Sequence, residues 1–228
     1  MKLSIIIPVY NEDNTIQEII NRVRTCGVED LDIVVVDDAS TDKTREKLQA
    51  YADDTDVRVF HHEVNAGKGA AIRTAQDKIR GDVVVIQDAD LEYAPEDLPH
   101  MLQVISENRA DAVFGSRYSG RELLVDTFWH YLGNKIITTW SNILSNLHLT
   151  DMETCYKMIR ADIFRELPLE CRKFGIEPEL TAKIAAKQCR IYEVPISYEA
   201  RSGAAGKKIG WKDGVAALWY VFKFNLLQ

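Results

Sequence analysis

Apolar residues in the first half of the chain fall in short continuous runs. The stretches between these runs carry apolar residues at every third or fourth position. The runs predict buried β-strands, and the stretches between them predict amphipathic helices. The predicted strands are LSIIIPV (3–9), DIVVVDD (32–38), VRVFHH (57–62), DVVVIQDAD (82–90) and DAVFGSR (111–117). The predicted helices cover 16–23, 40–52, 67–79 and 95–108.

Continuous apolar strands that alternate with helices are typical of a sheet buried on both faces. We therefore expect an α/β fold with a Rossmann-like, mainly parallel sheet flanked by helices. Ligands of such folds bind beyond the carboxyl ends of the strands. Polar clusters follow the predicted strands directly: PVYNE, VDDASTD, HHEVNAGKG, QDADLE and GSR. The pattern predicts that these clusters meet at one edge of the sheet.

The second half is less regular. It predicts a helix over 131–147, a strand at CYKMIR (155–160), a short helix after Asp162, a helix over 178–187 and a strand over 189–200. The last segment, 210–227, is an amphipathic helix with aromatic residues at helical spacing. Its apolar face is suited to the core or to a membrane surface, and core packing is the more common use.

Composition narrows the classes of partner and compartment. The 228 residues are 46% hydrophobic, enough for a substantial core, and the net charge of −7 argues against nucleic acid as a partner. The four cysteines form no CxxC pair, which favours reduced thiols. The first apolar stretch is too short for a signal peptide, and no run approaches the roughly 18 residues that span a bilayer. We expect a soluble cytoplasmic protein.

QDADLE places Asp88, Asp90 and Glu92 on alternating residues after a buried strand. In an extended chain alternate side chains point to the same side. Three carboxylates on one side suit Mg²⁺ or Mn²⁺, with diphosphate oxygens completing the coordination. The alternative is a solvated turn that caps the next helix.

Three further clusters leave two interpretations open. Asp37 and Asp38 in VDDAST could cap a helix or bind a base or ribose. NAGKGAA could offer N–H groups to an anion or be a simple glycine turn. The cations of the glycine-rich segment near the C-terminus, Arg201, Lys207 and Lys208, could close over a diphosphate or lie in a solvated loop. His61 and His62 lack metal-ligand spacing and are interpreted as structural.

Seven motifs in order carry a more specific signal. They are IIPVYNE, VDDASTD, N-GKGAA, DADLE, GSR, TDMETCYKM and Y-x-x-R…GKKI-W-DG. Together they resemble the family 2 glycosyltransferases with the GT-A fold, and most of all the dolichyl- or polyprenyl-phosphate sugar synthases. The resemblance implies a nucleotide-diphospho-sugar donor, a divalent metal and inversion at the anomeric carbon. It also implies one GT-A domain over 1–228, with a donor half (1–120) and an acceptor half (121–228).

The resemblance assigns roles to individual positions. The nucleobase positions are Pro8, Tyr10 and Glu12, and the nucleoside positions are Asp38 and Lys68. Asp88 and Asp90 match the acids on the metal and diphosphate, whereas Glu92 stands where these enzymes usually carry glutamine. Arg117 matches the arginine on the acceptor phosphate. Arg201 matches the cation on the donor diphosphate, with Lys207 in the same segment, and Lys135 supplies charge in an otherwise different acceptor segment.

The acceptor decides whether the reaction needs a base. A phosphate monoester has a second pKa near about 6, so it is already a nucleophile at neutral pH. A sugar hydroxyl acceptor in glycan synthesis needs a general base, for which TDMET offers Asp151 and Glu153. Both acids could instead orient substrates through hydrogen bonds. A lipid acceptor would make the protein peripheral at the cytoplasmic membrane face.

Two other functions compete with glycosyl transfer. A sugar-nucleotide pyrophosphorylase also uses an α/β domain and Mg²⁺, but its glycine-rich GxGTR-like loop is replaced by PVYNE. An inactive sugar-nucleotide-binding module is disfavoured by the retained acids and cations.

Overall fold

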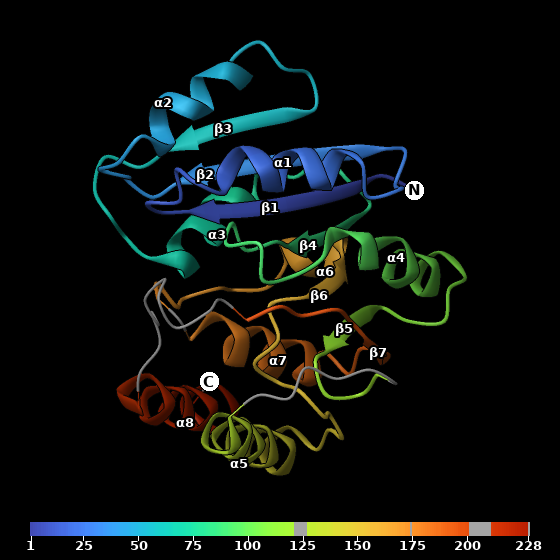
Figure 1. The fold of residues 1–228 in the computed structure, drawn as a ribbon. Coiled ribbons are helices and arrows are strands. Elements are labelled where there is room, and N and C mark those ends of the chain that lie inside the picture. Colours follow the sequence, from blue (N-terminus) through green and yellow to red (C-terminus); the bar gives the residue numbers. More distant parts are fainter. Residues whose placement is uncertain (121–126, 174, 201–210, 228) are drawn as a thin grey trace.

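The structure is a computed structural model that describes residues 1–120, 127–173, 175–200 and 211–227 (Figure 1). A seven-stranded sheet runs through the molecule in the order β3-β2-β1-β4-β6-β5-β7. The strands are β1 (Leu3–Val9), β2 (Leu31–Asp37), β3 (Val57–His61), β4 (Val83–Ile86), β5 (Ala112–Ser116), β6 (Lys157–Arg160) and β7 (Ile191–Pro195).

The sheet is parallel except at β6. β1 pairs in parallel with β2 and β4, β2 with β3, and β5 with β7. β6 is inserted between β4 and β5 and is antiparallel to both. The prediction of a mainly parallel sheet is confirmed, and the first five strands lie where the apolar runs predict them.

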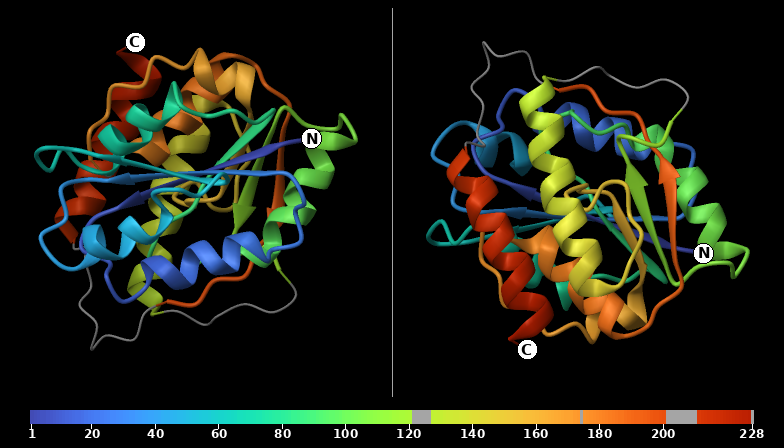
Figure 2. Two further views of the ribbon diagram at one scale, coloured as in Figure 1. Left: turned by 90° about the horizontal axis from the view of Figure 1, so that it is seen from above. Right: turned by 90° about the horizontal axis from the view of Figure 1, so that it is seen from below.

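Helices cover both faces of the sheet. They are α1 (Ile16–Arg24), α2 (Thr44–Leu48), α3 (Lys68–Gln76), α4 (Leu98–Ser106), α5 (Phe128–Ser145), α6 (Ala161–Arg165), α7 (Ile176–Ala186) and α8 (Trp211–Leu226), with 3₁₀ turns at Gln49–Tyr51 and Pro95–Asp97. Figure 2 shows α1, α2 and α4 on one face and α3, α6 and α7 on the other. This covering explains the continuous apolar runs, because Ile5, Ile6 and Ile7 of β1 are all fully buried.

α5 and α8 lie side by side and pack on α7, at the end of the molecule far from β3 (Figures 1 and 2). α8 buries Val221 and Phe224 but leaves Val215 and Trp219 more than half exposed. The helix therefore contributes to the core along one stripe and presents a second apolar stripe outward. Among the described residues, none of the helices combines the length and apolar character needed to cross a bilayer.

Several element boundaries differ from the predictions, and three of them bear on the site. β4 ends at Ile86 rather than continuing to Asp90, and β7 ends at Pro195, well before residue 200. α7 begins at Ile176, two residues before the proline that was expected to open it. Proline is tolerated within the first turn of a helix, where its missing N–H costs no hydrogen bond. The earlier start places Glu177 in the first turn of α7.

Candidate active site

The carboxyl ends of the parallel strands lie along one edge of the sheet (Figure 1). Tyr10 follows β1, Asp38 follows β2, Asp88 follows β4 and Arg117 follows β5. The antiparallel direction of β6 adds a segment that the sequence pattern did not place, because the amino end of β6 lies at this same edge. Residues 151–155, which precede β6, therefore join the strand ends as part of the site.

The chain is sharply bent at this edge. Asn11, Ala39 and Leu91 follow β1, β2 and β4 and have φ of 54°, 61° and 64°. Non-glycine residues in this left-handed region are uncommon and cluster where function constrains the backbone. Elsewhere among the described residues, positive φ in non-glycine residues occurs where helices end, as at Asn146 after α5.

The turn at Leu91 corrects the geometry expected for QDADLE. The three acids do not extend a strand, so strand alternation does not set the direction of their side chains. Asp88 pairs with a lysine, with Lys68 Nζ 2.7 Å from Asp88 Oδ1. Asp90 Oδ1 accepts a hydrogen bond from the backbone N–H of Glu92 at 3.3 Å. Glu92 accepts one from the hydroxyl of Tyr198 at 2.8 Å.

Lys68 links the acid motif to α7. Its Nζ also lies 2.7 Å from Oε1 of Glu177, so the ammonium is shared between two carboxylates. Burial alone would lower the pKa of Lys68, but the negative charge of Asp88 and Glu177 outweighs burial and raises the pKa well above its ordinary value. Sequence reasoning placed Lys68 near the nucleoside and missed Glu177. An acid in the first turn of a helix was the signal that could have found it.

The NAGKG turn is explained by packing. Gly67 has φ +95°, and a Cβ at Gly67 or Gly69 would lie 2.3 Å from a backbone carbonyl oxygen of the 171–172 segment. The N–H groups of Ala66 and Gly67 donate to Asp38 at 2.9 and 2.7 Å. These N–H groups are therefore used inside the chain, and the glycine-turn interpretation holds over the anion-binding one at these positions.

Asp38 is buried and has a third partner, Nδ1 of His62 at 2.7 Å. His61 pairs in the same way with Asp37, at 3.0 Å. Both histidines thus brace the acids after β2, as the structural interpretation expected. Asp38 organises the turn that leads into α3, and its predicted contact with a nucleoside stays a prediction.

Pro8, Tyr10 and Glu12 lie together at the end of β1, as the nucleobase prediction requires. Tyr10 is 42% exposed and presents its ring to solvent, whereas Glu12 is buried. Glu12 Oε2 accepts a hydrogen bond from the hydroxyl of Thr15 at 3.1 Å, which fixes it at the start of α1. The exposed ring is the side chain of the three that a base could stack on.

Arg117 and Asp151 form a bidentate pair. Nε and Nη2 of Arg117 lie 2.7 and 2.8 Å from the two oxygens of Asp151, and the backbone N–H of Arg117 adds a third bond at 3.1 Å. Asn134 Nδ2 donates to the same carboxylate at 3.2 Å. Burial opposes ionisation of Asp151, but the bonds to Arg117 outweigh it and lower its pKa. A saturated carboxylate with a lowered pKa is a poor base, so the structure supports the orienting role of Asp151 over the catalytic one.

Glu153 differs from Asp151 in its hydrogen bonding and in the direction of its pKa shift. Its Oε1 is buried and, within the described residues, has no hydrogen-bond partner. Burial and repulsion from Glu177 raise the pKa of Glu153 to about 7, against the opposing charges of Lys157 and Arg117. Lys157 is buried beneath the segment and donates to the carbonyl oxygens of Met152 and Thr154 at 2.7 and 2.6 Å. Lys157 was not among the predicted site residues, because a lysine in a short strand usually points to solvent.

Two cations contact the same aromatic ring near the end of β5. Arg117 Cζ and Lys135 Nζ lie 5.7 and 5.8 Å from the centroid of the Tyr118 ring. Lys135 also lies 5.7 Å from the ring of Tyr131. Cation–π contacts at these distances place both charges around the Tyr118 ring. The structure thus brings together the two residues predicted to bind the acceptor, from β5 and α5. The predicted donor cations Arg201 and Lys207 lie outside the described residues.

The metal prediction can be tested against the donor groups present. Within the described residues, no three His, Cys, Asp or Glu side chains are close enough to hold a metal ion by themselves. Mg²⁺ is usually held by one or two carboxylates together with substrate phosphates. Asp88 and Asp90 fit that arrangement as hard oxygen ligands. Glu92 contacts Tyr198 instead, so its place in the predicted ligand set has no support from the geometry.

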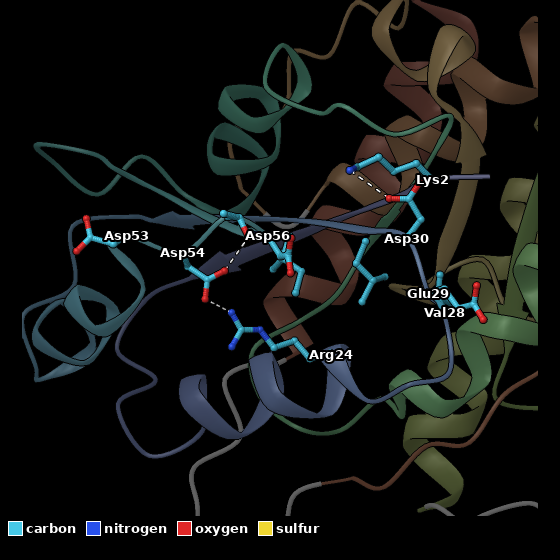
Figure 3. A pocket seen from close by; sticks show the side chains of 11 residues that line it. Lys2, Arg24, Val28, Glu29, Asp30, Asp53, Asp54 and Asp56 are labelled. Carbon is cyan, nitrogen blue, oxygen red and sulfur yellow. Dashed lines mark hydrogen bonds and ion pairs between the residues drawn. The ribbon is translucent and has the colours of Figure 1, made fainter.

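A separate cavity of ≈ 640 Å³ lies at the opposite edge, by the amino ends of β1, β2 and β3 (Figure 3). Lys2 Nζ lies 3.2 Å from Asp30 Oδ1, and Arg24 pairs with Asp54. The cations that line this cavity are therefore neutralised within it. Among the described residues, none of the predicted site residues lines it.

Comparison with known proteins agrees with this geometry. Residues 4–168 match the model of the glycosyl transferase family 2 domain. The chain belongs to glycosyl transferase family 2. It is therefore a glycosyltransferase, and the seven-stranded α/β architecture is the GT-A fold of that family.

Named relatives extend the likeness over nearly the whole chain. The undecaprenyl-phosphate mannosyltransferase of Micrococcus luteus is 32% identical and is matched over 96% of this chain and 92% of that protein. The low-salt glycan biosynthesis hexosyltransferase Agl6 of Haloferax volcanii is 30% identical over 99% of this chain, which spans about half (53%) of that protein. Glucosyl-3-phosphoglycerate synthase of Mycobacterium tuberculosis, solved with Mn²⁺ and UDP, has the same fold, with a TM-score of 0.72 at 17% identity over 98% of this chain and 80% of that one.

Proposed function

We propose that this family 2 enzyme transfers a sugar from a nucleotide-diphospho-sugar to the phosphate of a polyprenyl phosphate, with inversion at the anomeric carbon. The observation that carries the proposal is the pair of cations held around Tyr118. Arg117 is linked to the acid motif through Tyr198, and Lys135 contacts the same Tyr118 ring as Arg117. A phosphate dianion is the ligand that two cations around one ring suit best. The name of the Micrococcus luteus relative supports the same class of acceptor.

The donor side follows from the acid motif. Residues 1–120 would hold the nucleotide sugar, with Tyr10 on the base and Asp88 and Asp90 on Mg²⁺ or Mn²⁺. When bound, the cation supplies Lewis-acid stabilisation of the leaving diphosphate. Lys68 holds the carboxylate of Asp88 in place through an ion pair, and a second ion pair to Glu177 holds Lys68 there. Arg201 and Lys207 are proposed as further cations for the diphosphate.

The acceptor side, in residues 121–228, positions the nucleophile. The remaining N–H groups of the Arg117 guanidinium and the ammonium of Lys135 would bind the phosphate, while Asp151 holds Arg117 in one orientation. No group has to remove a proton, because the phosphate is already an oxyanion at neutral pH. Asp151 is then a positioning residue, as its saturated hydrogen bonds indicate.

The face formed by α5 and α8 suits contact with the membrane in which a polyprenyl phosphate resides. It carries a groove of ≈ 980 Å³ lined by Leu132, Lys135, Ile136, Thr139, Trp140, Ile143, Leu218, Trp219 and Phe222. Trp129 is 77% exposed nearby, and tryptophan is favoured at the interface between lipid and water. Because Lys135 belongs both to the groove and to the pair of cations, the lipid chain and its phosphate could be held at once. We therefore propose a peripheral protein at the cytoplasmic face of the membrane.

One observation favours a hydroxyl acceptor as the second candidate. The pKa of Glu153 is raised to about 7, which is where a general base works best. The two acceptors predict different pH behaviour for Glu153→Gln. With a phosphate acceptor, the substitution changes activity with little effect on its pH dependence. With a hydroxyl acceptor, the rate at high pH falls and the basic limb of the profile is lost.

The deciding experiment is a donor screen with Mn²⁺ in which released nucleoside diphosphate is measured. Farnesyl phosphate serves as the acceptor, and farnesol, which lacks the phosphate, is the matched control. We expect release that depends on farnesyl phosphate and is absent with farnesol. Release stimulated by farnesol or by free sugars, and unaffected by farnesyl phosphate, would refute the lipid-phosphate acceptor.

A further inference from the structure

Glu92 and Tyr93 are joined to Tyr198 and Glu199 by a backbone β-bridge and by a side-chain hydrogen bond. The backbone N–H of Glu199 donates to the carbonyl oxygen of Glu92 at 2.8 Å, and Tyr93 and Tyr198 form an antiparallel β-bridge. The hydroxyl of Tyr198 donates to Glu92 Oε2, also at 2.8 Å. We call this arrangement the 92–198 clasp. It ties the loop after β4 to the chain that follows β7, across 106 residues of sequence.

The aromatic rings make the clasp rigid. The rings of Tyr93 and Tyr198 meet edge to face at 5.2 Å, and Tyr93 packs on Tyr156 at 4.9 Å. Tyr93 is buried, and its hydroxyl accepts a hydrogen bond from the backbone N–H of Cys155 at 3.1 Å. Packing against Tyr93 and the hydrogen bond to Glu92 therefore fix the plane of the Tyr198 ring.

That plane faces the predicted acceptor cation. Arg117 Cζ lies 5.1 Å from the centroid of the Tyr198 ring, and the Arg117 side chain is only 10% exposed. A carboxylate that accepts a hydrogen bond from a phenol increases the electron density of the ring. A more electron-rich ring attracts a guanidinium more strongly. The charge of Glu92 thus acts on Arg117 through Tyr198.

We propose that Glu92 is a positioning residue for the acceptor site, which acts through Tyr198 on Arg117, and is not a ligand of the donor-side cation. The inference rests on the proposed function for the identity of the acceptor. It explains why an acid is tolerated next to Asp88 and Asp90, since the charge of Glu92 is directed toward the acceptor cation. It also gives Tyr198 a role beyond packing, which is to orient Arg117.

Two conservative substitutions test the two halves of the clasp. Glu92→Gln keeps a side-chain oxygen of the same reach but removes the charge, and Tyr198→Phe keeps the ring over Arg117 but removes the hydroxyl. Glu199→Gln is the matched control, because it removes the same charge from an exposed side chain one residue along. Each variant, and the Glu92→Gln/Tyr198→Phe double variant, is compared with the unaltered protein.

The first measurement is the binding of Mn²⁺ alone, followed by electron paramagnetic resonance. We expect Glu92→Gln to bind Mn²⁺ as the unaltered protein does. A weakening of about tenfold or more, the loss expected when a carboxylate ligand is removed, would overturn the proposal and make Glu92 a metal ligand.

The second measurement is the affinity for farnesyl phosphate by calorimetry, together with its KM. Glu92→Gln and Tyr198→Phe should each lower the affinity for farnesyl phosphate and raise its KM by about five- to tenfold. This factor is the difference between a charge-assisted hydrogen bond and a neutral or absent one. The double variant should be no worse than Tyr198→Phe alone, since Tyr198→Phe already removes the hydrogen bond to Glu92. The proposed action of Glu92 through Tyr198 would be refuted if the losses were additive. It would also be refuted if both variants bound farnesyl phosphate as tightly as Glu199→Gln does.

The proposed function can fail separately. If the unaltered protein does not bind farnesyl phosphate, the lipid-phosphate acceptor is refuted and the acceptor role of the clasp with it. The Mn²⁺ titration still decides whether Glu92 is a metal ligand. If the unaltered protein binds farnesyl phosphate and the variants bind it equally well, the proposed function stands and the clasp is refuted.

Discussion

Replacement of Lys157 with methionine is expected to destabilise the protein strongly. Lys157 lies in β6 with 1% of its surface exposed, and its ammonium donates to the carbonyl oxygens of Met152 and Thr154. Methionine has a similar length and fills the same space without strain. The substitution therefore removes two hydrogen bonds and leaves two buried carbonyl groups without these donors.

Two opposing effects set the magnitude. Burial is the largest influence on the pKa of Lys157 and lowers it below its ordinary value, which shows that the buried ammonium is costly. Against this cost stand two hydrogen bonds from a charged donor, each worth about 1.5–3 kcal/mol. Removal of one side of a buried charged network costs about 3–5 kcal/mol, because the other side is left unpaired. We expect a loss of about 3 kcal/mol in the free energy of unfolding, or about 6–12 °C in Tm for a chain of this size.

The assay is urea unfolding followed by circular dichroism. Lys157→Met should lower the midpoint without changing the m-value, which would show that the native state alone is affected. Lys187→Met is the matched control, since its ion pair with Glu166 is exposed and its removal should leave the midpoint unchanged within error. If Lys157→Met is as stable as the unaltered protein or more stable, the burial cost dominates and the reasoning about the 152–154 carbonyl groups is wrong.

Three other predictions follow from the same geometry. Gly69→Ala should lower the free energy of unfolding in urea by roughly 1–3 kcal/mol, because the added Cβ would lie 2.3 Å from the Cys171 carbonyl oxygen. Gly133→Ala is the matched control. Its added Cβ would have nothing within 4 Å, so it should stabilise α5 by up to about 1 kcal/mol. The pKa of Glu153 is raised from 4.5 to about 7, so the folded state binds this proton more tightly and loses stability as pH rises between these values. Glu153→Gln should therefore match the unaltered protein below about pH 4.5 and exceed it by about 3 kcal/mol above about pH 8. An equal difference at both pH values would contradict the assignment. Asp90→Asn should weaken donor binding in a titration with Mn²⁺ present, and an unchanged titration would remove Asp90 from the metal site.

The site residues divide between those that local pattern could find and those it could not. The acid motif, Arg117 and the 151–153 segment were identified because each follows a predicted strand or belongs to a recognisable motif, and Lys135 was chosen for its charge alone. Glu177 lies outside these motifs, and Lys157 lies within TDMETCYKM, but nothing in the sequence shows that its ammonium is buried. Glu177 matters because it lies 109 residues from Lys68 along the chain yet shares its ammonium.

The sequence alone determined the parallel sheet, its burial on both faces and the edge where polar clusters gather. These properties depend on the spacing of apolar residues within a few positions, because that spacing reflects which side chains are buried. The direction of β6, the turn at Leu91 and the partners of Glu92 and Lys68 were decided by the tertiary structure. Strand direction and the partner of a charge depend on segments about a hundred residues apart, whose approach is set by the packing of the whole core.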